Sequence, residues 1–212
     1  MHVVLASASP ARLGVLRAAG LDPAVEVADL DEDALLSTVP DASPGEKVVT
    51  LASAKATTVA RRVAATVPDA VVIGCDSMLL IDGELVGKPY TVEIARARWS
   101  AMAGRSGELL TGHAVLRVVD GDIDRVAEGH AVTGVRFAEP TPAELDAYLA
   151  SGEPLAVAGA FTLDGLGGWF VDGIDGDPSN VIGISLPLTR RLLAAVGVSV
   201  TDLWARAALT RD

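Results

Sequence analysis

The feature of the sequence that most restricts its fold is the apolar run Ala70–Gly74, AVVIG, which ends at Cys75-Asp76. An unbroken run of this length, rich in β-branched residues, is typical of a buried strand. Val3–Ala6 is a second short apolar run. The Ser9-Pro10 pair that follows it is typical of a helix start, because serine caps helices and proline fits their first position. Strands that alternate with helices in this way predict an α/β fold.

Further signals along the chain give the expected layout of the sheet. Capping positions and apolar periodicity predict helices over residues 10–19, 44–65, 92–103, 142–151, 188–196 and 201–208. Strands are expected over residues 25–27, 78–81, 84–87, 109–119 and 126–137, with a tight turn at Asp82-Gly83. These elements predict a mixed central sheet flanked by helices, in a single domain over residues 1–212. The Gly- and Asp-rich stretch 153–186 lacks periodicity and is expected to be a long functional loop.

The charge balance limits the partners of the chain. Its 212 residues include 28 acidic and 17 basic side chains, which gives a formal net charge of −11. Such a chain repels phosphate backbones, so binding to nucleic acids or anionic membranes is not expected, although a local cluster of cations would suit a small phosphorylated ligand. The single cysteine, Cys75, excludes an intramolecular disulfide and fits a reducing cytosol. Neither a signal peptide nor a long apolar span is evident, so a cytoplasmic protein is expected.

The first candidate site lies where the run Val3–Ala6 leads into a helix. Ser7, Ser9 and Arg12 would place two hydroxyl groups, a guanidinium group and the free N–H groups of a helix N-terminus around an anion. The same residues are also typical of an ordinary serine cap followed by a solvated arginine. The pattern alone leaves both interpretations open.

Asp76 is the second candidate. It is expected at the carboxyl end of the predicted strand, where open α/β sheets place their ligands, and a carboxylate there could bind a metal or act as a general base. The alternative is a turn residue that leads into the following hairpin. Cys75 beside it is interpreted as a small buried residue and not as a nucleophile, because no partner histidine is evident.

Two lysines complete the set of candidates. Lys55 lies among small and apolar neighbours in LASAKATT, and Lys88 directly precedes Pro89. Each alone is typical of a surface lysine, but in a chain this acidic a lysine with apolar neighbours is a better candidate for binding a polyanion. Residues 83–88, GELVGK, are one residue too few for a Walker A loop, and Pro89 replaces the Ser or Thr that such a loop needs.

Eight motifs occur in a fixed order from Leu5 to about Gly197. They are LASASPAR (5–12), Asp31-Glu32, LASAKA (51–56), GCDS (74–77), DGELVGKP (82–89), SGEP (151–154), AGAFTLDGLGGWF (158–170) and NVIGISLPL (180–188). Together they resemble the Maf family of nucleotide pyrophosphatases, whose members are often described as septum-formation inhibitors. Eight blocks in order are far more specific than any one of them, so the resemblance favours function over the structural alternatives given above.

The resemblance implies a mixed α/β fold with two lobes and a cleft between them. It implies an enzyme that removes pyrophosphate from nucleoside triphosphates with a divalent metal, Mg²⁺ or Mn²⁺. Asp76 matches the family's proton acceptor and is also a candidate metal ligand with Glu32. Positions that the family is proposed to use for triphosphate or metal are matched by Ser9, Arg12, Glu32, Lys55 and Lys88, with Ser7 added as a neighbouring ligand. Dimers are common among relatives, so a homodimer is a further expectation.

Three positions bear on the choice of base. Pyrimidine-selective relatives tend to carry Arg, Thr and Gln where this chain has Ala11, Ser77 and Asp164. A carboxylate at position 164 can accept hydrogen bonds from the N1–H and N2–H groups of guanine. Relatives that act on 7-methyl-GTP have an acidic residue there, so a guanine-type base is expected.

Two other functions are open to the sequence. A non-catalytic regulator of cell division would bind nucleotide, or a septation protein, without releasing pyrophosphate. A phosphatase that uses the same carboxylate would release orthophosphate instead. The retention of Asp76, Arg12 and both lysines favours the pyrophosphatase.

Overall fold

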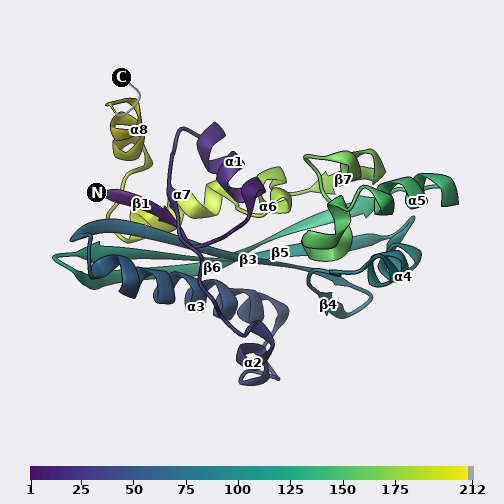
Figure 1. The fold of residues 1–212 in the computed structure, drawn as a ribbon, viewed down its shortest axis with the longest axis horizontal. Coiled ribbons are helices and arrows are strands. Elements are labelled where there is room, and N and C mark those ends of the chain that lie inside the picture. The colour runs from purple at the N-terminus through teal and green to yellow at the C-terminus, as the bar shows by residue number, and fades with distance from the viewer. Residues whose placement is uncertain (210–212) are drawn as a thin grey trace. The chain divides into compact units, whose positions relative to one another are not determined.

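A computed structural model describes the backbone of residues 1–209 and the side chains of residues 1–204 (Figure 1). Within these residues the strands form a seven-stranded sheet in the order β2-β1-β3-β5-β6-β7, with β4 paired to β3. Pairing is parallel from β1 to β2 and β3 but antiparallel from β3 to β4 and from β6 to β7, so the sheet is mixed, as predicted. The strands are β1 (His2–Leu5), β2 (Ala24–Val25), β3 (Asp69–Ile81), β4 (Glu84–Val86), β5 (Ser106–Val119), β6 (Asp122–Phe137) and β7 (Val171–Asp175).

The six predicted helices begin and end close to the expected positions, and two further helices, α2 and α6, were not predicted. The α-helices are α1 (Pro10–Ala18), α2 (Glu32–Ser37), α3 (Pro44–Ala64), α4 (Val92–Met102), α5 (Pro142–Ala150), α6 (Pro178–Ile182), α7 (Leu186–Ala195) and α8 (Val200–Leu209). Three 3₁₀-helices are η1 (Glu153–Ala156), η2 (Ala158–Ala160) and η3 (Leu166–Phe170). No helix within residues 1–209 is long and apolar enough to span a membrane.

Capping explains most of these boundaries. Ser43 and Thr141 form complete capping boxes with the glutamates three residues later, and Ser9 and Thr91 accept a backbone N–H from the first turn of their helices. The two-residue turn Asp82-Gly83 has positive φ at both positions, 50° and 83°, as a type I′ hairpin requires.

The chain divides into two compact units, where the family resemblance implied two lobes. The first unit comprises residues 1–76, 111–131 and those from 183 onward, and the second comprises residues 77–110 and 132–182. By these bounds β3, β5 and β6 each contribute residues to both units. The predicted cleft between the lobes stays a prediction.

In the first unit, helices cover both faces of the sheet. Figure 1 shows α3 on one face and α1 and α7 on the other. Alternate residues of β3 enter the two cores, because side chains on a strand point to opposite faces in turn. Val71, Ile73 and Cys75 pack with α1 and α7, whereas Val72 packs with the small residues of α3.

The backbone of α3 lies directly against the sheet at two glycines. A Cβ atom added to Gly112 on β5 would lie 2.1 Å from the carbonyl oxygen of Val48, and one added to Gly74 on β3 would lie 2.6 Å from that of Ala52. Any side chain larger than hydrogen at these positions would therefore push α3 away. The close contact holds the middle of α3, which carries Lys55, near β3.

The second unit has a core with several aromatic side chains. Trp99 of α4 is fully buried, makes edge-to-face contacts with Phe137, Tyr148 and Phe170, and donates its indole N–H to the carbonyl oxygen of Ala160 at 2.8 Å. Such aromatic pairs favour one geometry over others and so fix the packing of α4 and α5 against the sheet.

Three expectations from the sequence need correction. The runs at 70–74 and 78–81 are one strand, β3, so Asp76 lies inside a strand and not at its carboxyl end. The stretch 153–186 is not a loop, because it contains the three 3₁₀-helices together with β7 and α6. The acidic run at residues 29–33 leads into α2, which the sequence analysis did not predict and which Asp31 caps.

Candidate functional site

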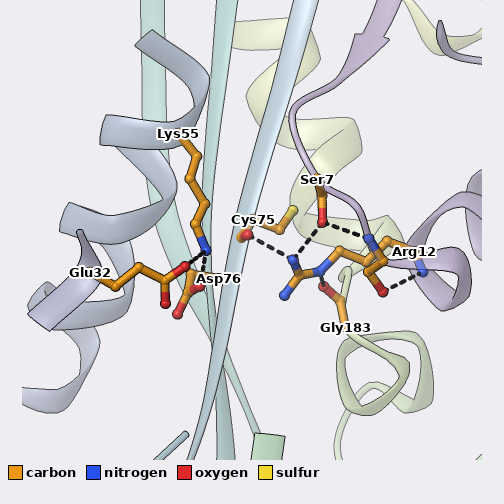
Figure 2. Close-up of polar contacts among 8 residues, drawn as sticks. Ser7, Arg12, Glu32, Lys55, Cys75, Asp76 and Gly183 are labelled. Atoms are coloured by element: carbon orange, nitrogen blue, oxygen red, sulfur yellow. Dashed lines mark hydrogen bonds and ion pairs between the residues drawn. The ribbon is translucent and has the colours of Figure 1, made fainter. Parts of the chain in front are cut away.

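Lys55 joins two carboxylates in the first unit (Figure 2). Its Nζ atom lies 2.5 Å from Oδ1 of Asp76 and 2.7 Å from Oε1 of Glu32. The side chains of Lys55 and Asp76 are mostly buried, at 14% and 10% exposure, whereas that of Glu32 is 45% exposed. The group therefore runs from an enclosed aspartate to a glutamate that faces solvent.

Three elements bring these residues together. Asp76 is on the face of β3 that packs against α3, because its neighbour Cys75 belongs to the opposite core. Lys55 lies near the middle of α3, beside the contact between Gly74 and the helix backbone. Glu32 is the first residue of α2, whose start is fixed by the cap from Asp31 to the N–H of Ala34 at 2.9 Å.

Burial controls the charge of the Asp76 carboxylate. Burial raises the pKa of Asp76 above its usual value, and the positive charges of Lys55 and Arg12 offset only part of that rise. Burial alone would lower the pKa of Lys55, but Asp76 and Glu32 outweigh it and raise that pKa. Lys55 therefore remains a cation while Asp76 has a higher affinity for a proton than an exposed aspartate, which suits a general base.

Arg12 is held by three acceptors on the other side of β3 (Figure 2). Its Nε atom donates to the carbonyl oxygen of Gly183 at 2.8 Å, and its Nη1 atom donates to Ser7 Oγ and to the carbonyl oxygen of Cys75, both at 2.9 Å. Ser9 caps α1 by accepting the N–H of Arg12 at 3.3 Å. These contacts fix a guanidinium group next to the peptide that precedes Asp76.

The end of β1 explains why the two groups meet at this point. Leu5 on β1 pairs with Ile73 on β3, and the N–H of Ala6 donates to the carbonyl oxygen of Ile73 at 2.8 Å. β1 then ends at Leu5 while β3 continues through Asp76. The carboxyl-end rule for ligand sites therefore applies to β1, and Asp76 lies on the neighbouring strand, three residues beyond the partner of Leu5.

Cys75 is a structural residue, as the sequence analysis proposed. Its side chain is fully buried, and burial raises the pKa of the thiol to about 12, with Arg12 offsetting only part of the effect. A thiol with this pKa stays protonated at neutral pH and is a poor nucleophile. The contribution of Cys75 to the site is its backbone carbonyl.

The two units divide the predicted residues between them. The first contains Ser7, Ser9, Ala11, Arg12, Glu32, Lys55 and Asp76, and the second contains Ser77, Lys88 and Asp164. Of the latter three, Lys88 and Asp164 have exposed side chains and Ser77 is half-buried. The contacts that join Asp76, Lys55 and Glu32, and those that join Arg12 and Ser7, are all internal to the first unit.

The residues that fix the Arg12 side chain through Gly183 were not predicted from the sequence. Gly183 contributes only a carbonyl oxygen, so no side chain marks its role. Two residues on, the backbone N–H of Ser185 donates to Nε2 of the fully buried His113 at 2.8 Å, and Nδ1 of His113 lies 3.0 Å from the carbonyl oxygen of Thr111. A histidine in the mainly apolar middle of β5 was a signal that could have pointed to this link.

The two carboxylates at the site suit a metal ion whose other ligands are phosphate oxygens of a bound nucleotide and water. No group of three or more His, Cys, Asp or Glu side chains within the described part of the chain could hold a metal ion. Asp76 and Glu32 do bring two carboxylates to the same ammonium group. Mg²⁺ is usually bound by one or two carboxylates together with substrate phosphates and water, so this pair fits such an ion.

Comparison with known proteins assigns the chain to a family. The family model described as Maf-like protein matches residues 2–196. A Saccharopolyspora erythraea protein named nucleoside triphosphate pyrophosphatase is 63% identical over 205 residues, which make up 96% of this chain and 97% of that protein. A Nocardia farcinica protein of the same name is 64% identical over 203 residues, or 95% and 96% of the two chains.

A solved structure, that of the Staphylococcus aureus Ham1 protein, aligns over 100% of this chain and 98% of its own at 13% identity and a TM-score of 0.40. A match this weak adds nothing to the assignment, which rests on the family match over residues 2–196 and on the high identity to the two relatives. The chain belongs to the Maf-like protein family.

Proposed function

We propose that this protein hydrolyses the bond between the α- and β-phosphates of a nucleoside triphosphate, giving the monophosphate and pyrophosphate. The observation that carries the proposal is that the buried carboxylate of Asp76 has two cations beside it. Lys55 Nζ lies 2.5 Å from that carboxylate, and the guanidinium group of Arg12 donates to the backbone carbonyl of the preceding residue, Cys75. A general base beside cations is what hydrolysis of a polyphosphate requires. The name that the 63% and 64% identical relatives carry supports the same activity.

In this mechanism Asp76 acts on the attacking water. Its carboxylate accepts a proton as the water oxygen bonds to the α-phosphorus, and the bond from that phosphorus to the bridging oxygen of the β-phosphate breaks. The raised pKa of Asp76 favours the proton transfer. Arg12 and Lys55 stabilise the negative charge that accumulates on the departing pyrophosphate, and Ser7 and Ser9 contribute hydroxyl groups near the N-terminus of α1. Lys88 is proposed as a further triphosphate-binding residue on the family resemblance alone.

We further propose that the enzyme depends on a divalent metal, Mg²⁺ or Mn²⁺. Glu32 and Asp76 are the residues that would hold it, together with oxygens of the triphosphate. When bound, such an ion supplies Lewis-acid stabilisation of phosphoryl oxygens. Glu32 has nearly half of its side chain exposed, so it can leave Lys55 and bind the ion without becoming a buried unpaired charge. Lys55 would still be paired with Asp76.

The base is proposed to be of the guanine type. Asp164 is exposed and can accept hydrogen bonds from the N1–H and N2–H groups of guanine. Ala11 and Ser77 take the places of the Arg and Thr that accompany pyrimidine selectivity among relatives. We also infer a cytoplasmic enzyme that clears unwanted nucleotides, with a homodimer and a link to cell-division arrest as further proposals that follow from the family resemblance.

Product analysis tests the activity directly. The purified protein is incubated with standard and modified nucleoside triphosphates, with Mg²⁺, Mn²⁺ or EDTA, and both pyrophosphate and orthophosphate are measured. We expect pyrophosphate, a requirement for the added metal, and the highest rate with a guanine-type base. Orthophosphate alone would indicate a phosphatase. Stoichiometric nucleotide binding without either product would indicate a non-catalytic regulator, and a faster reaction with UTP than with every guanine nucleotide would refute the assignment of the base.

A further inference from the structure

One carboxylate in the second unit accepts hydrogen bonds from one side chain and two backbone N–H groups. Glu153, the first residue of η1, accepts hydrogen bonds from Thr162 Oγ1 at 2.5 Å and from the backbone N–H groups of Leu166 and Gly167, both at 3.0 Å. The segment 162–167 is thus tied at both of its ends to one side chain. Asp164 lies in the middle of that segment.

Glu153 supplies the cap that η3 lacks in its own sequence. The N-cap of η3 is Gly165, which has no side chain, and Leu166 and Gly167 are the first two residues of that helix. The first N–H groups of a helix have no partner within it, so they need an external acceptor. The two oxygens of Glu153 take this role from 13 and 14 residues earlier in the chain.

The segment is closed tightly around this carboxylate. A Cβ atom added to Gly165 would lie 2.7 Å from Oε2 of Glu153, and one added to Gly167 would lie 2.7 Å from the backbone nitrogen of Thr162. A local cap residue at position 165 and Glu153 therefore exclude each other. Glycine at 165 is required by the arrangement and does not indicate that the segment is loose.

The charge state of Glu153 agrees with this arrangement. Burial raises the pKa of the carboxyl group, but the hydrogen bonds from Thr162, Gly167 and Leu166 outweigh burial and bring the pKa below its usual value. The ionised form, which has two acceptor oxygens, is therefore the form that the segment stabilises. The outward side of the same segment is solvent-exposed at Asp164, Gly165 and Leu166.

We propose that Glu153 is a positioning residue for base specificity, which holds the segment 162–167 so that Asp164 presents its carboxylate to the nucleotide base in one fixed place. The inference rests on the proposed function, in which Asp164 recognises the nucleotide base through hydrogen bonds. Glu153 itself does not touch the nucleotide. A carboxylate held on a fixed backbone discriminates between hydrogen-bonding edges better than one on a mobile loop, because ordering it costs no free energy on binding.

The test compares Glu153→Gln with Glu139→Gln, which changes an exposed glutamate of the same unit. Glutamine keeps the size of the side chain but replaces one acceptor oxygen with an N–H donor, so one of the two backbone N–H groups loses its partner. We expect the ratio of kcat/KM for the preferred guanine-type nucleotide to that for UTP to fall about tenfold, mainly through KM, as loss of one hydrogen bond to a charged group implies. The kcat for the preferred nucleotide should stay within about twofold of wild type.

Amide hydrogen exchange provides a readout that does not depend on activity. In Glu153→Gln at least one of the amides of Leu166 and Gly167 should exchange about tenfold faster while the amides of β5 and β6 keep their protection. Gly165→Ala is a second variant, which displaces the carboxylate without removing its charge and should reproduce both effects. Combining either variant with Asp164→Asn should give no further loss of selectivity, because both act through the same contact.

The outcomes separate this inference from the proposed function. If the wild-type protein releases no pyrophosphate from any nucleotide, the proposed function itself is wrong. If it does release pyrophosphate, an unchanged selectivity ratio in Glu153→Gln and Gly165→Ala overturns the role of Glu153 alone. A wild-type enzyme with no base preference overturns it as well, and so does global unfolding of both variants, which would make Glu153 a residue of the core of the second unit.

Discussion

The ammonium group of Lys55 lies 2.5 Å from the carboxylate of Asp76, and both side chains are mostly buried. An ion pair in this setting is sensitive to the loss of one partner, because the remaining charge is left in a poorly hydrated place. Glu32, which is half exposed, shares the same ammonium group at 2.7 Å. The ion pair of Lys55 with Asp76 therefore affects the pKa of Asp76, and Lys55 also supplies positive charge that could bind a triphosphate.

Replacing Lys55 should shift the pH dependence of the reaction. The charge of Lys55 lowers the pKa of Asp76, so Lys55→Gln should raise that pKa further. The general base must be deprotonated, and activity is lost as the pH falls through its pKa. The acid limb of the profile of kcat/KM against pH should therefore move to higher pH in Lys55→Gln. Lys47→Gln on the same helix is the control, and a limb that stays in place or moves to lower pH would contradict the pairing.

Replacing Asp76 should remove most of the turnover. Asparagine is nearly the same size as aspartate but accepts no proton, so Asp76→Asn should lose about 10²–10⁴-fold in kcat, the usual contribution of a general base. The measurement is initial-rate kinetics with pyrophosphate as the detected product. Asp82→Asn in the β3–β4 turn is a matched control, since asparagine tolerates the positive φ of 50° at that position. Near-normal turnover in Asp76→Asn would remove Asp76 from the mechanism.

A methyl group at Gly74 should separate α3 from the sheet. The added Cβ of Gly74→Ala would lie 2.6 Å from the carbonyl oxygen of Ala52, so the backbone must shift, at a cost of about 1–3 kcal/mol in the free energy of unfolding. Because α3 carries Lys55, kcat/KM should fall as well. Denaturant unfolding and kinetics check the two effects. Gly14→Ala in α1 is the control, since its Cβ would meet no atom within 4 Å and alanine favours a helix.

Replacing His113 should weaken the support behind Arg12. Nε2 of His113 accepts the buried N–H of Ser185 at 2.8 Å, and leucine cannot replace that acceptor. His113→Leu should cost about 1–3 kcal/mol in the free energy of unfolding, as expected for a buried donor that loses its partner. The reaction should show a higher KM, because the carbonyl of Gly183 that holds Arg12 lies two residues away. His2→Leu, at an exposed position, should change neither quantity.

The sequence predicted the elements whose signals are local. The Ser43 and Thr141 capping boxes, the Ser9 cap and the turn at Asp82-Gly83 each depend on residues within a few positions of one another, and each is present in the structure. The association of Lys55 with Asp76 was expected from the resemblance to a family. It could not have come from periodicity, since the two residues are on different elements.

Features that depend on distant residues were not predictable in this way. Asp76 interrupts an apolar pattern and looked like the end of a strand, but β3 continues through it because Lys55 neutralises the buried carboxylate. The stretch 153–186 looked like a loop because its glycines and aspartates obscure any periodicity. Within it, the segment 162–167 is held by Glu153, whose partners lie 9 to 14 residues away.

The contact of α3 with the sheet has a consequence for mutational surveys of this protein. At its closest points it is made by backbone atoms and by very small residues, among them Gly74, Gly112, Ala52 and Ala56. A scan that truncates side chains to alanine skips the two alanines and, at the two glycines, adds atoms instead of removing them. Such a scan would therefore detect this surface only at the two glycines, where it adds a methyl group, and the two alanines would have to be enlarged in a separate experiment.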